Sequence, residues 1–263
     1  MTPKHWLKEA LRFIAAMSPF LMFALIYNSM RYFPNYLFND IDTEGVYHLE
    51  KQLFGIVADG VRLTPCEFFH LHHWAFTDVL SGMFYLCWVP LPILYSIWLF
   101  ATGQRRLSMQ LSAAFLFVNL IGFCGYYIYP ASPPWYVMEH GFTPVLNTPG
   151  NAAGFINFDN VLHVKLFQTF YSGNANVFAA IPSLHAAYCP IALYYALKVK
   201  NNTTWIVVLS LVSVGIWWSA VYSGHHYIID VLLGILTTIL GVAIFDGIIM
   251  KHVPSKWFAW LHD

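Results

Sequence analysis

Two short motifs in the second half of the chain carry the side chains best suited to chemistry. Pro-Ser-Leu-His at 182–185 and His-His-Tyr-Ile-Ile-Asp at 225–230 supply three imidazoles and a carboxylate. His226 and Asp230 are four residues apart, so on a helix they lie on one face, one turn from each other. A carboxylate placed there fixes the imidazole tautomer, stabilises positive charge on the ring and leaves the other ring nitrogen free to attack. His226 is therefore the candidate nucleophile.

The first motif supplies the partner histidine. Pro182 suits the start of a helix, and a helix start presents free backbone N–H groups, here near Ser183 and Leu184, that can face an anion. We expect Ser183 to bind substrate there and His185 to act as general acid and base. Two histidines, one carboxylate and a helix start are the parts needed for phosphoryl or phosphodiester transfer.

The sequence between the motifs predicts that they lie at the same depth in a membrane. Two apolar runs, 185–198 and 205–222, are joined by a short polar turn. At about 1.5 Å rise per residue each run is about 20 to 27 Å long, close to one bilayer crossing when the motif residues are included. We therefore expect His185 and His226 on the same membrane face.

Composition places the whole chain among membrane proteins. It is 58% hydrophobic and only 10% charged, whereas about a quarter of the residues in soluble domains are charged. Zero formal net charge and the lack of a basic cluster exclude a general nucleic-acid surface. The four cysteines show no paired spacing and are interpreted as packing residues.

Apolar runs predict an all-α, polytopic fold with six transmembrane helices in a single integral membrane domain, 1–263. The spans are expected at 13–30, 74–100, 107–129, 185–198, 205–222 and 227–249. The first is interpreted as a retained span and not a signal peptide, because it lacks a small-residue cleavage site and five more apolar segments follow. The core is expected at 74–249, with the N-terminal span and an interfacial helix in 1–73.

Two segments are expected at the membrane surface. Leu49, Leu53, Ile56 and Val57 have helical spacing within a mixed segment, which predicts a helix lying at the interface. Residues 130–176 are rich in Gly, Asn and Pro and form the longest irregular segment, a long outer loop. Its aromatic content favours an ordered cap.

The distribution of basic residues predicts the orientation. Six spans with the N-terminus inside place nine Lys and Arg residues on the cytosolic side and four opposite, in agreement with the positive-inside rule. Both histidine motifs and the long loop then face away from the cytosol. The active site is expected on the periplasmic side of a bacterial inner membrane, or in the Golgi lumen of a eukaryote.

The two motifs resemble those of the type 2 phosphatidic acid phosphatase superfamily, whose membrane members carry Pro-Ser-x-His and a later His-x-x-x-Asp. Within it the chain is most similar to the inositol phosphorylceramide synthase branch, on the motif at 182–185, the doubled His225-His226-Tyr227 and the loop 129–136. The resemblance covers roughly 78–234. It implies a membrane lipid phosphotransferase of the sphingolipid synthase type that moves phosphoinositol from phosphatidylinositol to ceramide and releases diacylglycerol.

The resemblance also implies the catalytic roles. His226 attacks phosphorus and forms a phosphohistidine, while His185 protonates the leaving glycerol oxygen and then deprotonates the acceptor hydroxyl. Asp230 orients His226 and compensates its charge throughout. Neither a metal nor another cofactor is expected, because the helix start at Pro182 and the imidazoliums carry the charge.

Two cationic motifs of the phosphatase members are absent. The chain has no Lys-x6-Arg-Pro, and Ser219 is followed by Ala220 where those members have arginine. A phosphomonoester is close to a dianion and suits several cationic side chains, whereas a phosphodiester carries a single charge. The sequence therefore favours a lipid phosphodiester as donor, with a lipid phosphatase as the alternative. A lipid transporter or proton-linked channel is the non-enzymatic alternative, but spans three and five offer almost no polar path.

The remaining candidates are assigned to substrate binding. His225 either contacts substrate directly or supports its neighbour at the interface. Asp78, near the outer end of the second span, orients a histidine or an inositol hydroxyl, or is a helix-end carboxylate beside water. Tyr129, Trp135 and Tyr136 shape the rim of a headgroup pocket, or mark an aromatic belt and a proline break.

A cluster of histidines outside the two motifs invites a metal interpretation. His70, His72 and His73 follow Glu67 closely. Their spacing matches neither a structural zinc site nor a His-Glu-x-x-His helix. No metal site is predicted.

Overall fold

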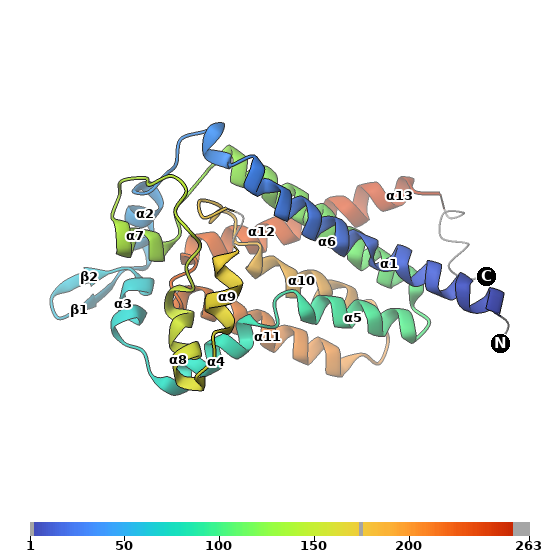
Figure 1. Cartoon of the computed structure of the whole chain (residues 1–263). Helices are drawn as coiled ribbons and strands as arrows, with labels where there is room; N and C mark the ends of the chain where they lie inside the picture. The colour runs from blue at the N-terminus through green and yellow to red at the C-terminus, as the bar shows by residue number, and fades with distance from the viewer. Residues whose placement is uncertain (1–2, 174–175, 255–263) are drawn as a thin grey trace.

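A computed structural model describes residues 3–173 and 176–254. The chain forms an elongated helical bundle with a cap of shorter elements at one end, and α1 begins at the end opposite the cap (Figure 1). The bundle helices are α1 (Pro3–Ser29), α4 (Ala75–Tyr85), α5 (Pro90–Ala101), α6 (Arg105–Ile128), α10 (His185–Ala196), α11 (Thr203–Tyr222) and α12 (Ile228–Ile244). The cap contains α2 (Gly45–Phe54), β1 (Ile56–Ala58), β2 (Val61–Leu63), α3 (Pro65–Leu71), α7 (Pro134–His140), α8 (Ile156–Leu162) and α9 (Leu166–Ser172).

Short helical segments complete the described chain. Three are 3-10 helices, η1 (Met30–Tyr32), η2 (Asn35–Leu37) and η3 (Ala153–Phe155). Beyond α12 the helix continues as a π-helical turn, η4 (Phe245–Ile249), and then α13 (Met250–His252).

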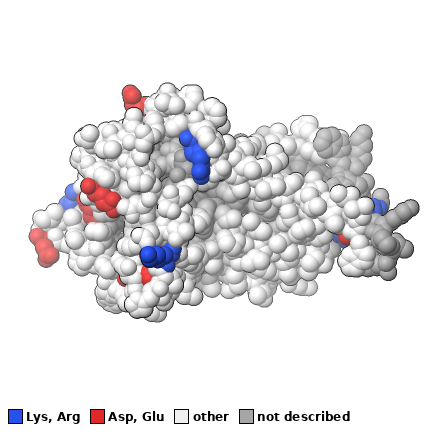
Figure 2. Space-filling model, viewed as in Figure 1, with Lys and Arg blue, Asp and Glu red and all other residues white. Residues whose placement is uncertain are grey.

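The predicted all-α membrane fold is confirmed, although six spans are not. Within 3–173 and 176–254, four helices are long and apolar enough to cross a membrane, and the bent pair α4 and α5 would make a fifth. Figure 2 shows charged side chains gathered at the cap and at the opposite end, with an uncharged surface between them. Such a band is what a bilayer requires of the surface that it contacts.

The fourth expected span explains the difference. It corresponds to α10, which has only 12 residues and is therefore about 18 Å long, too short to cross the hydrocarbon core alone. Ala186, Cys189 and Ile191 are completely buried, because α10 packs against α6, α11 and α12. A helix enclosed by other helices does not need the length of one that faces lipid, so the count of six stays a prediction.

The second expected span is broken. Its two halves, α4 and α5, meet at a bend of 43°, and α5 begins at Pro90. Proline is well suited to the first position of a helix but not to its interior, because it lacks the N–H that an interior position must donate. The kink predicted at Pro90 and Pro92 is thus a break between two helices.

The helix predicted at the membrane interface is shorter than expected. Leu49 and Leu53 lie on α2 with exposed side chains, but Ile56 and Val57 belong to β1, which pairs antiparallel with β2. The prediction that these two residues continue the helix is wrong. Asp59 and Gly60, both with positive φ, form the two-residue turn of a hairpin, and Asp-Gly is a strong hairpin signal.

The long outer loop is more regular than predicted. It contains α7, α8 and α9, and is therefore not a continuous irregular segment. Asp159 holds two of these helices together, since its carboxylate accepts hydrogen bonds from the backbone N–H groups of Leu166, Phe167 and Gln168 at the start of α9. Phe155, Phe158, Phe167 and Tyr171 are buried in the same core. These aromatic side chains give the cap its ordered interior.

Candidate active site

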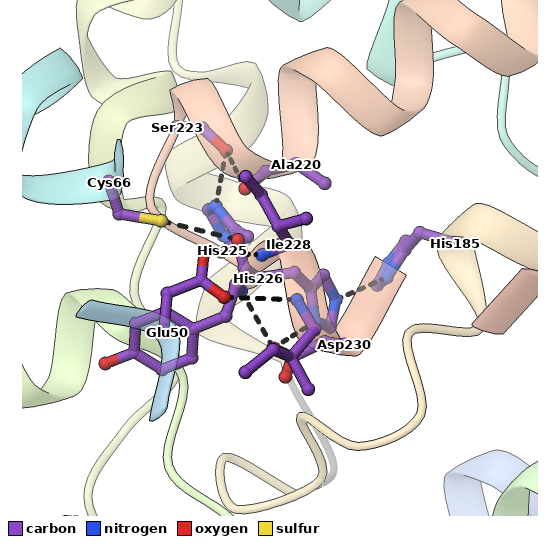
Figure 3. A network of polar contacts seen from close by, with 11 residues as sticks. Glu50, Cys66, His185, Ala220, Ser223, His225, His226, Ile228 and Asp230 are labelled. Atoms are coloured by element: carbon purple, nitrogen blue, oxygen red, sulfur yellow. Dashed lines mark hydrogen bonds and ion pairs between the residues drawn. The ribbon is translucent and has the colours of Figure 1, made fainter. Parts of the chain in front are cut away.

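His185 and His226 contact each other directly. The Nδ1 atom of His185 lies 3.1 Å from Nε2 of His226, and the two side chains point toward one another in Figure 3. On the other side of the ring, Nδ1 of His226 lies 3.4 Å from Oδ2 of Asp230. An ionised carboxylate only accepts hydrogen bonds, so in the neutral ring the proton of His226 belongs on Nδ1. The lone pair on Nε2 then faces His185.

The turn between α11 and α12 presents His226. The backbone N–H groups of His225 and His226 both donate to the carbonyl of Ala220 at 3.0 Å. Asp230 lies in the first turn of α12, where its Oδ2 accepts from the backbone N–H of Tyr227 at 2.9 Å. Oδ2 of Asp230 therefore both caps the start of α12 and contacts the His226 ring.

A close backbone approach joins the two motifs. The N–H of Ser183 donates to the carbonyl of Asp230 at 2.9 Å. One turn further along α12, a Cβ atom at Gly234 would lie 2.0 Å from the carbonyl oxygen of Ser183. Only glycine permits this distance, so the start of α10 and the start of α12 are held backbone to backbone.

The same contact corrects one expectation about anion binding. The Ser183 N–H was expected to face an anion, but Asp230 already accepts from it. The expectation failed because helix starts in packed proteins are often satisfied by neighbouring chain. The Oγ atom of Ser183 is still available to bind an anion. It is completely buried and has no hydrogen-bond partner in the part of the chain that the structure describes.

Aromatic rings enclose the histidines. The His185 ring centroid lies 5.0 Å from that of Tyr85 and 4.5 Å from that of Trp88. His225 lies 4.9 Å from Phe155 and 4.4 Å from Tyr171. These walls come from the bend between α4 and α5 and from the cap. They line the space around the His185–His226 pair, in which His226 is buried and His185 is partly buried.

His225 is held apart from the His185–His226 pair. Its Nδ1 lies 3.1 Å from the Ser223 hydroxyl. Burial, and to a smaller extent the neighbouring His226, lowers the pKa of His225 to about 3. The ring is therefore uncharged at neutral pH and acts as a polar wall, with no salt bridge.

Asp78 is part of a separate polar network. Its carboxylate accepts from the Tyr222 hydroxyl at 2.8 Å, and its other oxygen lies 3.0 Å from Nδ1 of His73. The histidine that Asp78 contacts is His73, which lies outside the two motifs, so a role for Asp78 in the site stays a prediction.

The tyrosines at the predicted rim support loops. The Tyr129 hydroxyl binds the carboxylate of Asp42. The Tyr136 hydroxyl donates to the Thr143 carbonyl at 3.0 Å and accepts from the Val145 N–H at 2.6 Å. Neither hydroxyl is directed to the histidine pair.

Trp135 lies closer to the site and borders a cavity in the cap. Its backbone N–H donates to the carbonyl of Gly224 at 2.8 Å, next to the histidine motif. The cavity has a volume of about 490 Å³, and the Asn151 carbonyl in its wall also contacts His225. Its polar lining consists of Glu139, His140, Asn147, Thr148, Asn151, Gln168 and Ser172.

The clustered histidines near Glu67 do not converge. Nδ1 of His72 contacts the Phe68 carbonyl, His73 contacts Asp78, and Glu67 closes the start of α3 through the Thr64 N–H. Across the described ranges, no three His, Cys, Asp or Glu side chains are placed to share a metal ion.

One buried acid was not singled out in the sequence. Glu50 of α2 is completely buried, and its two carboxylate oxygens accept from the backbone N–H groups of Ile228 at 2.9 Å and Ile229 at 3.2 Å. Burial, only partly offset by these hydrogen bonds, raises the pKa of Glu50 to about 7. No local pattern distinguishes this glutamate from other acids of the same segment, because its partners lie 178 residues away.

Comparison with known proteins gives a consistent set of relatives. Residues 61–244 match the family model described as the PAP2 superfamily. The chain is 53% identical over 236 residues to a phosphoinositol dihydroceramide synthase of Bacteroides thetaiotaomicron, covering 90% of this chain and 77% of that protein. No solved structure matches.

Fungal proteins match at lower identity. The chain is 26% identical over 240 residues to the inositol phosphorylceramide synthase catalytic subunit AUR1 of Saccharomyces cerevisiae, covering 90% of this chain and 56% of that protein. It is 28% identical over 181 residues to an inositol phosphorylceramide synthase of Candida albicans, covering 65% of this chain and 37% of that protein. The chain therefore spans about half or less of the length of these fungal relatives.

Proposed function

Since the chain belongs to the PAP2 superfamily, as its two histidine motifs indicated, we propose that it is an integral membrane lipid phosphotransferase of the inositol phosphorylceramide synthase type. It moves phosphoinositol from phosphatidylinositol to the primary hydroxyl of a ceramide or dihydroceramide and releases diacylglycerol. The whole chain acts as one integral membrane domain. The observation that carries the proposal is the 3.1 Å contact between His185 and His226, with Asp230 behind His226.

The first step forms a phosphohistidine. Nε2 of His226 attacks phosphorus, the bond from phosphorus to the glycerol oxygen breaks, and the imidazolium of His185 gives that oxygen a proton. An anionic phosphodiester that binds beside His185 favours the charged form of its ring. Asp230 stabilises the positive charge that develops on His226 and keeps its Nδ1 proton in place.

The second step releases the product. His185, now neutral, takes the proton of the acceptor hydroxyl, whose oxygen attacks phosphorus and displaces His226. The direct contact of the two rings supports this exchange of roles, because one small movement of His185 reaches either the leaving or the entering oxygen. The aromatic walls around the histidines keep water from competing with the acceptor.

Substrate binding is assigned to residues at the same end of the bundle. The free Oγ of Ser183 donates to a phosphate oxygen, and the cavity beside Trp135 holds the inositol ring against its polar side chains. His225 forms the wall between that cavity and the histidine pair. Tyr129 and Tyr136 act through the loops that they hold, and Asp78 acts through His73.

The reaction takes place on the non-cytosolic face. Arg105 and Arg106 follow α5, and Lys198 and Lys200 follow α10, at the end of the bundle opposite the cap (Figure 1). The positive-inside rule assigns that end to the cytosol. The cap and the histidine pair then face the periplasm in a bacterial cell.

The test is a direct assay of the purified full chain in lipid vesicles. We expect inositol phosphorylceramide and diacylglycerol when phosphatidylinositol and ceramide, or dihydroceramide, are both supplied, and little reaction without the acceptor. Phosphatidate is supplied in parallel as a phosphate monoester. Hydrolysis of phosphatidate without any ceramide-dependent product would favour the lipid phosphatase and reject the transferase.

A further inference from the structure

A carboxylate from outside the region matched by the family model binds the start of α12, the helix that carries Asp230. Glu50 lies on α2, before residue 61, where the match begins. Figure 3 shows its side chain reaching Ile228 at the start of α12, beside His226 and Asp230. Within the residues that the structure describes, Glu50 makes no hydrogen bond or ion pair with either ring of the catalytic pair. Both of its oxygens are occupied by backbone N–H groups.

The first turn of α12 therefore depends on two acids. The first N–H groups of a helix have no partner within the helix, and negative charge is favoured at that end. Asp230 accepts from Tyr227, and Glu50 accepts from the next two residues. Asp230 serves the turn from within, whereas Glu50 reaches it from another element.

Burying a carboxylate at this position costs folding free energy, and a side chain that only filled space would avoid that cost. Removing a charged group from water is unfavourable unless strong hydrogen bonds replace the lost hydration. An apolar side chain of similar volume would fill the same space but leave two helix N–H groups without partners, which also costs stability. The Glu50 carboxylate therefore satisfies the N–H groups at the start of α12, and Asp230 lies in that same first turn.

We propose that Glu50 is a positioning residue, which holds the first turn of α12 so that Asp230 meets Nδ1 of His226 and Nε2 of His226 faces His185. Glu50 acts through Asp230 and touches no reacting atom. Its effect on turnover rests on the proposed function, whereas its effect on the helix start does not. The interfacial helix α2 thereby becomes part of the catalytic apparatus.

The experiment compares Glu50→Gln and Glu50→Ala with Glu44→Gln in the full chain. Glu44 precedes α2 and is exposed, so its change to glutamine makes the same substitution without touching α12. Hydrogen exchange at the amides of Ile228 and Ile229 reports the contact itself. We expect the exchange rate of these two amides to rise about tenfold or more in Glu50→Gln, because hydrogen bonds to charged groups are stronger than those to neutral groups. In Glu44→Gln the exchange rate should stay unchanged.

Turnover supplies the second measurement. We expect kcat to fall about tenfold in Glu50→Gln and about a hundredfold in Glu50→Ala, with KM for the donor lipid within twofold of wild type, since misplacement of a catalytic group affects the chemical step. A double-mutant cycle with Asp230→Asn should be non-additive, because both changes act on the same contact with His226. A residue that only stabilises the fold would give additive losses.

Each outcome decides the proposal. Unchanged exchange at Ile228 and Ile229 in Glu50→Gln overturns it, as does a kcat equal to that of Glu44→Gln or an additive cycle. If wild type turns over phosphatidate instead of phosphatidylinositol with ceramide, the proposed function fails and the cycle is measured with phosphatidate. If wild type turns over neither, the proposed function fails while the exchange data alone decide whether Glu50 holds the helix start.

Discussion

The backbone N–H of Ser183 donates to the backbone carbonyl of Asp230 at 2.9 Å. These two residues come from the two separate histidine motifs, so the motifs are joined by their main chains as well as by their histidines. Backbone contacts of this kind leave little freedom for either helix start to move alone. The relative placement of His185 and His226 is therefore set by the packing of α10 against α12.

Loss of the nucleophile should abolish transfer without unfolding the protein. We expect His226→Ala to reduce kcat at least about a thousandfold, because within the described residues His226 supplies the imidazole nitrogen that contacts His185. The thermal midpoint should stay close to that of wild type. His5→Ala, a change of an exposed histidine at the opposite end of the bundle, is the matched control and should leave transfer unchanged. A His226→Ala enzyme of normal rate would refute the assignment of the nucleophile.

The close approach at Gly234 can be tested by adding one methyl group. In Gly234→Ala the new Cβ would meet the Ser183 carbonyl at 2.0 Å, so the two helix starts must separate. We expect kcat to fall about a hundredfold and the thermal midpoint to drop. In Gly247→Ala the new Cβ meets nothing within 4 Å, and the same methyl group should leave both quantities unchanged or slightly raise stability. Equal effects of the two changes would argue against the close approach.

The free hydroxyl of Ser183 should matter for turnover more than for stability. Ser183→Ala removes a buried oxygen that has no hydrogen-bond partner among the described residues, so unfolding should become no easier. We expect kcat to fall about tenfold to a hundredfold because a donor to the phosphate is lost. Ser81 is also buried with an unpartnered Oγ in the described structure. Ser81→Ala should keep full activity, and a normal rate in Ser183→Ala would remove Ser183 from the site.

The cavity beside Trp135 predicts a selective effect on binding of the donor lipid. Gln168 lines it, and Gln168→Ala should raise KM for phosphatidylinositol about twofold to tenfold, the worth of one hydrogen bond, while kcat stays unchanged. Gln52→Ala changes an exposed glutamine on α2 and serves as the control. Initial rates over a range of donor concentrations separate the two constants. A fall in kcat with unchanged KM would place the inositol ring elsewhere.

The raised pKa of Glu50 predicts a dependence of stability on pH. Burial raises the pKa of Glu50 from 4.5 to about 7, so between these values the folded protein binds a proton that the unfolded chain has released. Stability contributed by this group is present below pH 4.5 and is lost as the pH rises toward 7. The lowered pKa of His225 contributes the opposite slope between about pH 3 and 6.5.

Comparison of variants isolates the Glu50 contribution. We expect Glu50→Gln to lose the part of the pH dependence that falls between 4.5 and 7, whereas Glu44→Gln retains it. Thermal midpoints measured in one detergent across this range provide the check. If the difference between Glu50→Gln and wild type does not change with pH, the Glu50 carboxyl titrates with its ordinary pKa.

Several features followed from local sequence alone. Apolar runs of membrane length indicated the helical bundle, and their lengths placed His185 and His226 at the same end. A spacing of four residues correctly paired His226 with Asp230, but His226 lies in the turn before α12 and not on the helix face that was predicted. These features are local, because helix periodicity and hydrophobic length depend on neighbouring residues.

Contacts between distant segments were decided only by tertiary packing. The sequence did not indicate that α10 lies inside the bundle, that Asp78 pairs with His73, or that Ser183 gives its N–H to Asp230. Nor did it indicate Glu50, whose partners lie 178 residues away. Which buried donor finds which acceptor depends on how whole helices dock, and residue spacing along one helix carries no record of that docking.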